Sequence, residues 1–232
     1  HNDALLESFK ESSHEKRIMA TAPLSQTVQV VITYRRFATA LYVSHINAMR
    51  NFEMAFQRSG LKVQFTQGFN PKPKLEFVNP LSIGIGGEEE VLLAELIDEE
   101  NLDEEKVRSE LQHSLNEGYT VRDVLFLRGT KKQTLAKHLK GSCYHINTKG
   151  VEPYTEKLES YLGIGDASLE VSRCEEPYHY VVRLAGERNL IKLLFGAETD
   201  KFMIASKLSI KREKLFAGSW ETGYIEYLQS IE

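Results

Sequence analysis

Residues 66–74 (TQGFNPKPK) combine backbone constraints with polar side chains that could recognise a ligand. Gly68 can adopt a positive φ, whereas Pro71 and Pro73 fix their own φ and bias the preceding residues toward extended conformations. Because a restricted chain loses little conformational entropy when it orders, such a segment can hold its side chains rigidly. The composition therefore predicts a rigid loop.

The side chains of this loop suit recognition of an anion or a carbonyl group. Asn70 offers a donor and an acceptor. Lys72 and Lys74 stand two residues apart, which places both cations on one side of an extended chain. The alternative interpretation is a turn between two elements, in which the lysines are incidental.

A second group of chemically interesting residues opens a predicted helix at Ser44. Ser44 is a typical N-cap, and Asn47, three residues on, can reciprocate as the Glu or Gln of a capping box does. His45 lies at the positive end of the helix dipole, which disfavours its protonated form and predicts a neutral imidazole. His45 is a weak candidate for a catalytic acid or base if it faces the 66–74 loop, and a structural residue otherwise.

Hydrophobic periodicity predicts an α+β fold built from two ferredoxin-like units. The first unit, residues 26–127, follows the order strand, helix, two strands, helix, strand. Its expected elements are a strand at 28–34, a helix from 44 to 60, strands at 75–78 and 91–97, a helix from 103 to 118 and a strand at 121–127, with an extra short strand at 61–65.

The second unit, residues 142–232, follows the same order with a weaker pattern, after a basic connector at 128–141. Its expected elements are a strand at 143–146, a helix from 153 to 163, a hairpin of 169–171 and 178–184, a helix at 190–195 and a closing strand at 202–210. Residues 1–25 are predicted to be a linker or a loosely docked N-terminal segment. Since the chain begins with His1, we expect a tag remnant or a piece of a longer polypeptide.

The composition excludes several classes of protein. The apolar fraction of 41% and charged fraction of 27% are those of a globular domain, and the net charge of −4 argues against a coat-like nucleic-acid binder. Cys143 and Cys174 are too few for a disulfide scaffold or a four-thiolate metal site, and we expect them to be reduced in the cytoplasm. We find no signal peptide or membrane-spanning run, and we expect no membrane partner.

Charge is distributed unevenly along the chain. Residues 25–85 hold seven basic and two acidic residues, whereas residues 86–117 hold twelve acidic and two basic ones. Residues 128–140 add five basic residues. One interpretation is a basic face that attracts an anionic partner while the acidic block points away; the other is an ordinary solvated surface.

Three motifs together resemble the signature of the radical SAM-linked protein family. They are residues 44–50 (SHINAMR), residues 67–75 (QGFNPKPKL) and residues 80–84 (PLSIG). The resemblance covers residues 28–128 well and the remainder loosely. Asn47 stands where that family usually has Asp, and Lys72 where it commonly has His, which favours a binding role over proton transfer or metal binding.

The resemblance implies a partner, because that family lies beside, or is fused to, cobalamin-binding radical SAM proteins. The iron–sulfur cluster, S-adenosylmethionine and cobalamin would belong to that partner, since this chain has no C-x-x-x-C-x-x-C motif. We therefore expect no metal or cofactor in this chain. The candidate binding residues are His45, Asn47, Arg50, Gln67, Gly68, Phe69, Asn70, Lys72 and Lys74.

Two functional hypotheses follow, from different classes. The first is a non-catalytic substrate-recognition or docking module for a radical SAM enzyme, with RNA as the expected anionic ligand and a steep salt dependence of binding. The second is an enzyme acting on RNA or a small anionic substrate, with His45 as acid or base and with Arg50, Asn70 and Lys72 holding charge. A structural scaffold domain is a third option. The substrate, the oligomeric state and whether the partner is in cis or trans stay open.

Overall fold

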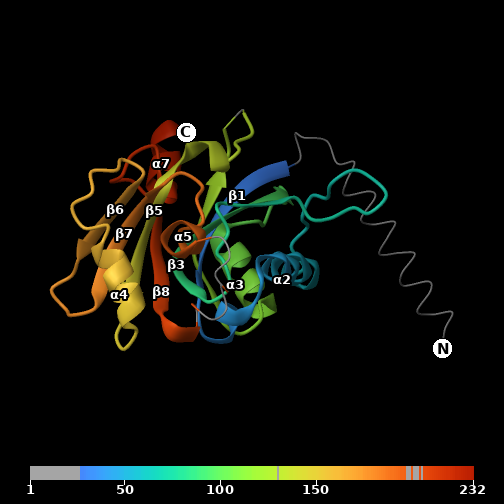
Figure 1. Ribbon diagram of the computed structural model, residues 1–232. Helices are drawn as coiled ribbons and strands as arrows, with labels where there is room; N and C mark the ends of the chain where they lie inside the picture. Colours follow the sequence, from blue (N-terminus) through green and yellow to red (C-terminus); the bar gives the residue numbers. More distant parts are fainter. Residues whose placement is uncertain (1–26, 130, 197–199, 201–203, 205) are drawn as a thin grey trace, which may run out of the picture.

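The computed structural model describes residues 27–129, 131–196, 200, 204 and 206–232. The predicted N-terminal segment 1–25 lies outside these residues. The fold is α+β, with an eight-stranded mixed sheet that runs through the whole molecule (Figure 1). None of the helices in this part of the chain has both the length and the apolar character needed to cross a bilayer.

The first half of the chain forms the predicted ferredoxin-like unit. Its elements are β1 (Thr27–Arg36), the 3-10 helix η2 (Ala38–Tyr42), α2 (His45–Arg58), β2 (Leu75–Phe77), β3 (Ile85–Ile97), α3 (Glu104–Ser114) and β4 (Tyr119–Leu127). The strands are antiparallel in the order β4-β1-β3, with β2 on the remaining edge of β3. Both long helices begin where the sequence predicts, because Ser44 and Asp103 accept hydrogen bonds from the backbone N–H groups of Asn47 and Lys106.

The second half repeats this arrangement. Its elements are η3 (Ala136–His138), β5 (Leu139–Asn147), α4 (Glu152–Glu159), β6 (Leu169–Arg173), β7 (His179–Ala185), α5 (Leu190–Phe195), β8 (Ser209–Ala217) and α7 (Tyr224–Ile231). The strand order β8-β5-β7-β6 is the same relative order as in the first unit. The two units share one sheet, because residues 85–87 of β3 pair in parallel with residues 210–212 of β8.

Several predicted elements differ from the structure. The closing strand predicted at 202–210 is wrong: Ile204, Ser206 and Lys207 are helical, residues 201–203 and 205 lie outside the described residues, and the strand is Ser209–Ala217. Its charged run 211–214 has the composition of a solvated surface, yet Arg212 is buried. Residues 61–65 contribute isolated bridges rather than a regular strand, α4 ends at Glu159, and α7 was not predicted.

The two faces of the sheet are covered differently in the two units. In the first unit, α2 and α3 pack on one face, while α7 and the connector around Leu135 cover the other. In the second unit, α4 and α5 cover the face that carries Tyr144 and Ile146. The alternate positions of β5, which include Cys143 and His145, lie on the opposite face.

Candidate functional site

The 66–74 loop is an excursion from the edge of the sheet. Residues 62–64 and β2 lie along the same edge of β3, and the loop leaves the edge between them. Its two ends meet at Glu95, whose carbonyl accepts a hydrogen bond from Gln64 N at 2.7 Å and whose N–H donates to the Lys74 carbonyl at 3.2 Å. The edge of the sheet therefore fixes both ends of the loop.

A short ladder of hydrogen bonds holds the two arms of the loop together. Thr66 N donates to the Lys72 carbonyl at 2.7 Å, and Lys72 N donates to Thr66 Oγ1 at 3.0 Å. Phe65 is buried in the core below the ladder. At the tip, Gly68 adopts a φ of +134°, which few other residues tolerate. These contacts fix the two arms at residues 66 and 72, and Gly68 has the positive φ that the sequence allows.

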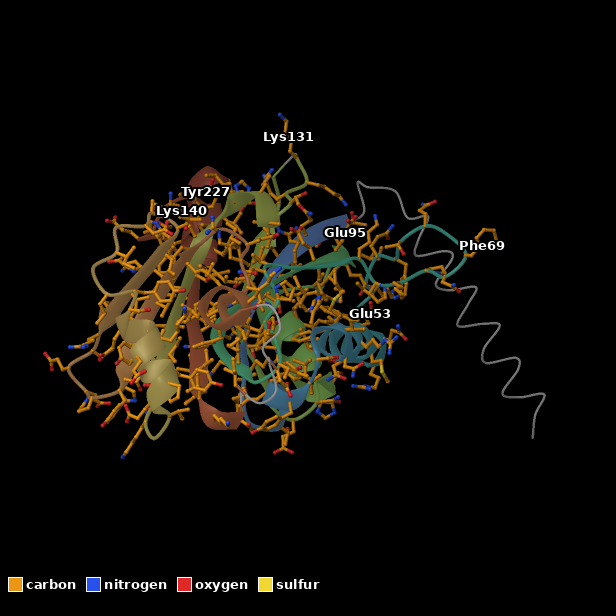
Figure 2. All side chains as sticks on the ribbon, viewed as in Figure 1. Glu53, Phe69, Glu95, Lys131, Lys140 and Tyr227 are labelled. Carbon is orange, nitrogen blue, oxygen red and sulfur yellow. The ribbon has the colours of Figure 1, made fainter. Side chains whose placement is uncertain are left out.

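The tip of the loop presents an aromatic ring to solvent. Phe69 is fully exposed, with a relative accessibility of 106%, and it stands at the outer end of the loop while Glu95 lies near its root (Figure 2). Gln67, Asn70 and Lys72 are exposed around it. The loop thus displays an aromatic ring, two amides and a cation.

The root of the loop is an ion-pair cluster centred on Glu95. Lys132 and Lys74 both approach this carboxylate, Lys74 Nζ at 3.7 Å, and Thr27 donates a hydrogen bond to it. Burial alone would raise the pKa of Glu95, but the hydrogen bonds from Lys132 and Thr27 outweigh it and hold the pKa below its usual value. Lys74 is therefore engaged in holding the loop, whereas Lys72 is exposed.

The acidic block does not point away from the basic residues. Four of its twelve carboxylates lie on β3, and five residues at or just beyond this strand form ion pairs with basic residues from elsewhere in the chain. The pairs are Arg35, Arg122 and Lys211 with Glu88, Arg212 with Glu90, Lys74 and Lys132 with Glu95, Arg128 with Asp98, and Lys62 with Glu99. Five of the twelve basic residues in segments 25–85 and 128–140 are therefore paired with carboxylates, which reduces the basic face expected from counting charges along the chain.

His45 lies at the first turn of α2, beside the buried side chain of Arg36. The Arg36 guanidinium donates to the carbonyls of Ala40, Leu41, Val43 and Leu81, and so fixes the segment that leads into the helix. Burial lowers the pKa of His45, and the positive charge of Arg36 lowers it further. The imidazole is thus kept neutral, as predicted, but by burial and a cation in addition to the helix dipole.

The structure separates His45 from the loop. Arg36 pairs with Gly87 on β3, whereas the loop joins the same strand at Glu95. Eight strand residues span about 26 Å at ~3.3 Å per residue. Asn47, whose N–H is used in the helix cap, and the exposed Arg50 lie on the first two turns of α2 with His45. The nine candidate residues therefore form two groups.

Acidification should destabilise the protein partly through His45. Because its folded-state pKa lies below the unfolded value of about 6.5, the neutral imidazole contributes stability above that pH, and this contribution is lost as the pH falls. We expect the midpoint of thermal unfolding to fall less between pH 7 and pH 5 in His45→Gln than in the wild type. The exposed His113→Gln is the matched control. An equal or larger fall in His45→Gln would contradict the prediction.

The structure also brings together residues that the sequence analysis did not combine. Cys143 and His145 lie on β5, and Glu213 lies on the neighbouring strand β8. His145 Nε2 is 2.7 Å from Glu213 Oε2. Burial, aided by the charge of Glu213, raises the pKa of Cys143 to about 11, so its thiol is neutral at neutral pH. Both Cys143 and Cys174 are free.

Comparison with known proteins adds a family. The sequence pattern of a family described as an uncharacterised protein conserved in bacteria (DUF2344) matches residues 29–175. The chain belongs to this family. The match runs from the third residue of β1 through the rest of the first unit and the connector, and it ends after β6 in the second unit. No curated protein matches this member of the family.

Solved structures resemble the family member only distantly. A protein of unknown function from Galdieria sulphuraria is 11% identical, with 81% of this chain and 98% of that chain covered and a TM-score of 0.27. A putative glycine cleavage system transcriptional repressor is 13% identical, with 79% and 95% covered and a TM-score of 0.24.

Proposed function

We propose that this protein is an accessory recognition module that binds single-stranded RNA through the 66–74 loop. The observation that carries the proposal is the full exposure of Phe69 at the tip of a loop whose arms and root are fixed by hydrogen bonds. An exposed aromatic ring forgoes roughly 1.5–3 kcal/mol of burial free energy. A binding partner that covers the ring recovers that free energy.

The chemistry around the ring favours RNA as the ligand. Unpaired bases are bound by stacking on aromatic side chains and by hydrogen bonds to their edges, and phosphates are bound by cations. Phe69 offers the stacking surface, Gln67 and Asn70 offer amides, and Lys72 offers the cation. A loop that is already ordered also loses less entropy when it binds.

The ion pairs on β3 restrict the size of the RNA site. Since Lys74, Lys132 and Lys62 already face carboxylates, Lys72 is the main cation at the tip. We therefore revise the expected steep salt dependence to a shallow one. Contact with one or two phosphates predicts that doubling the salt concentration weakens binding by roughly 1.6- to 2.6-fold.

Replacing the ring tests this function. Stacking of one base contributes about 1–3 kcal/mol, so we expect Phe69→Ala to weaken binding about five- to hundredfold. Fluorescence anisotropy with labelled single-stranded oligouridine and oligoadenosine of 12 nucleotides (a length of order one such binding site) measures this. Phe69→Trp should retain binding, and Met54→Ala, an exposed apolar change on α2, is the control.

Two outcomes would contradict RNA binding. One is no detectable binding by the wild type to either oligonucleotide. The other is equal affinity of Phe69→Ala and the wild type. If Phe69→Ala instead abolishes capture of a protein that nuclease treatment leaves in place, the loop docks a protein rather than RNA.

The partnership with a radical SAM enzyme rests on the sequence motifs 44–50, 67–75 and 80–84. In this proposal, the partner holds the iron–sulfur cluster, S-adenosylmethionine and cobalamin, and this chain supplies recognition in the cytoplasm. Affinity purification with and without nuclease should recover a radical SAM protein. The alternative, an enzyme with His45 as acid or base, is not favoured by the geometry. His45 lies near the Gly87 end of β3, whereas Asn70 and Lys72 lie on the loop that joins β3 at Glu95.

A further inference from the structure

Three potential metal ligands meet on the face of the second unit that α4 and α5 leave uncovered. Cys143 and His145 are two residues apart on β5 and therefore point to the same side of the sheet. Glu213 reaches them from β8, beside the irregular pairing between Cys143 and Tyr144. One ligand atom from each of the three side chains lies within 4.8 Å of the other two.

We propose that Cys143, His145 and Glu213 bind Zn²⁺. A thiolate, an imidazole and a carboxylate are all zinc ligands, with bonds of about 2.0–2.3 Å that place the ligand atoms roughly 3.3–3.8 Å apart. The side chains of His145 and Glu213 are 44% and 56% exposed, so both can rotate toward the thiol. This site is separate from the RNA-binding loop and departs from the sequence-based expectation of no metal in this chain.

The charges of the cluster suit a divalent cation. Once the thiol has lost its proton, Cys143 and Glu213 supply two negative charges, and His145 binds as the neutral imidazole. The neighbouring cations are partly engaged by other carboxylates: Lys211 Nζ is 3.3 Å from Glu88 Oε1, and Arg183, which also contacts the Cys143 thiol, reaches Glu170 at 4.0 Å. Zinc would replace the contact between Arg183 and the thiol.

Three protein ligands leave a fourth position open. His145 lines a cavity of about 540 Å³, together with Cys174, His179 and Lys211. Because the side chains of His145 and Glu213 are half-exposed, the open position of the zinc would be accessible from solvent. Three protein ligands and one exchangeable position are the arrangement of zinc sites that bind water or a substrate, whereas purely structural sites are closed by a fourth protein ligand.

Cobalt titration of the full chain tests the site. Co²⁺ replaces Zn²⁺ in tetrahedral sites, and a cysteine ligand gives a thiolate-to-cobalt charge-transfer band. After treatment with a chelator and its removal, we expect one Co²⁺ per chain with this band, and its loss when Zn²⁺ is added. Cys143→Ser should abolish the band, and His145→Ala and Glu213→Ala should each weaken Co²⁺ binding at least tenfold.

Cys174→Ser is the matched control, because it removes the other free thiol and should keep the band. Circular dichroism of each variant shows whether it is folded. If Cys143→Ser does not fold, His145→Ala and Glu213→Ala carry the test, since both residues are half-exposed. Absence of the band in the wild type, its persistence in Cys143→Ser, its loss in Cys174→Ser, or unchanged affinity in the His145 and Glu213 variants would overturn the proposal.

Discussion

Arg212→Met is expected to lower the free energy of unfolding by about 3–5 kcal/mol, because it leaves Glu90 as an unpaired buried charge. Arg212 and Glu90 are 1% and 3% exposed at the side chain, and Arg212 Nε is 2.9 Å from Glu90 Oε1. The guanidinium also donates to Tyr144 Oη at 3.3 Å and to the Asn79 carbonyl at 2.7 Å. Urea denaturation followed by circular dichroism measures the loss.

The double variant Arg212→Met/Glu90→Gln separates the buried charge from the lost packing. Removing both charges should recover part of the stability, because the uncompensated carboxylate is gone. Arg173→Met is the control: its ion pair with Glu159 is on the surface and should contribute about 1 kcal/mol or less. An Arg212→Met variant as stable as Arg173→Met would show that the buried pair does not hold the sheet together.

The position of Arg212 explains why so much depends on it. The residue lies on β8, and its partners lie on β3, on β5 and in the segment before β3. Only a few residues of β3 and β8 pair directly, so the buried pair reinforces a short junction between the two units. We therefore expect Arg212→Met to weaken the attachment of the second unit as well as the global stability.

The sequence predicted those parts of the fold that depend on local chemistry. The starts of α2 and α3 followed from Ser44 and Asp103, whose side chains cap the helices, and the loop between residues 65 and 75 followed from Gly68, Pro71 and Pro73. These residues act on backbone within three or four positions of themselves. A single sequence therefore carries the information that is needed to place them.

The parts that the sequence did not predict depend on strand register. β8 was misplaced because residues 211–214 (KREK) are all charged and so lack the alternation of apolar and polar residues that indicates a strand. Only the pairing of β8 with β3 and β5 shows that Arg212 faces the interior. The approach of Glu213 to Cys143 and His145 joins residues about 70 positions apart. Likewise, the ion pairs of Glu88 and Glu90 follow from the place of β3 between β1 and β8 in the sheet. Counting charges along the chain carries no such information.

Phe52→Ala is expected to destabilise the protein by about 3–5 kcal/mol, the usual result of replacing a buried phenylalanine with alanine. Phe52 is completely buried on the inner face of α2. Its ring lies 4.7 Å from that of Tyr34, 5.3 Å from that of Tyr119 and 5.5 Å from that of Phe77, measured between centroids. The residue thus joins α2 to β1, β4 and β2, and its loss leaves a cavity at the centre of the first unit. Urea denaturation monitored by circular dichroism measures this change.

Two further variants of α2 show whether the loss comes from the cavity. Phe52→Leu keeps much of the volume and should cost markedly less than Phe52→Ala. Met54→Ala lies two residues along the same helix, where the side chain is 52% exposed, and should change the free energy of unfolding by no more than about 0.5 kcal/mol. Similar losses in Phe52→Ala and Met54→Ala would contradict the prediction, because the loss would then not come from the aromatic cluster. Because β2 begins one residue after the 66–74 loop ends, the contact between Phe52 and Phe77 also links this core to the loop that we propose to bind RNA.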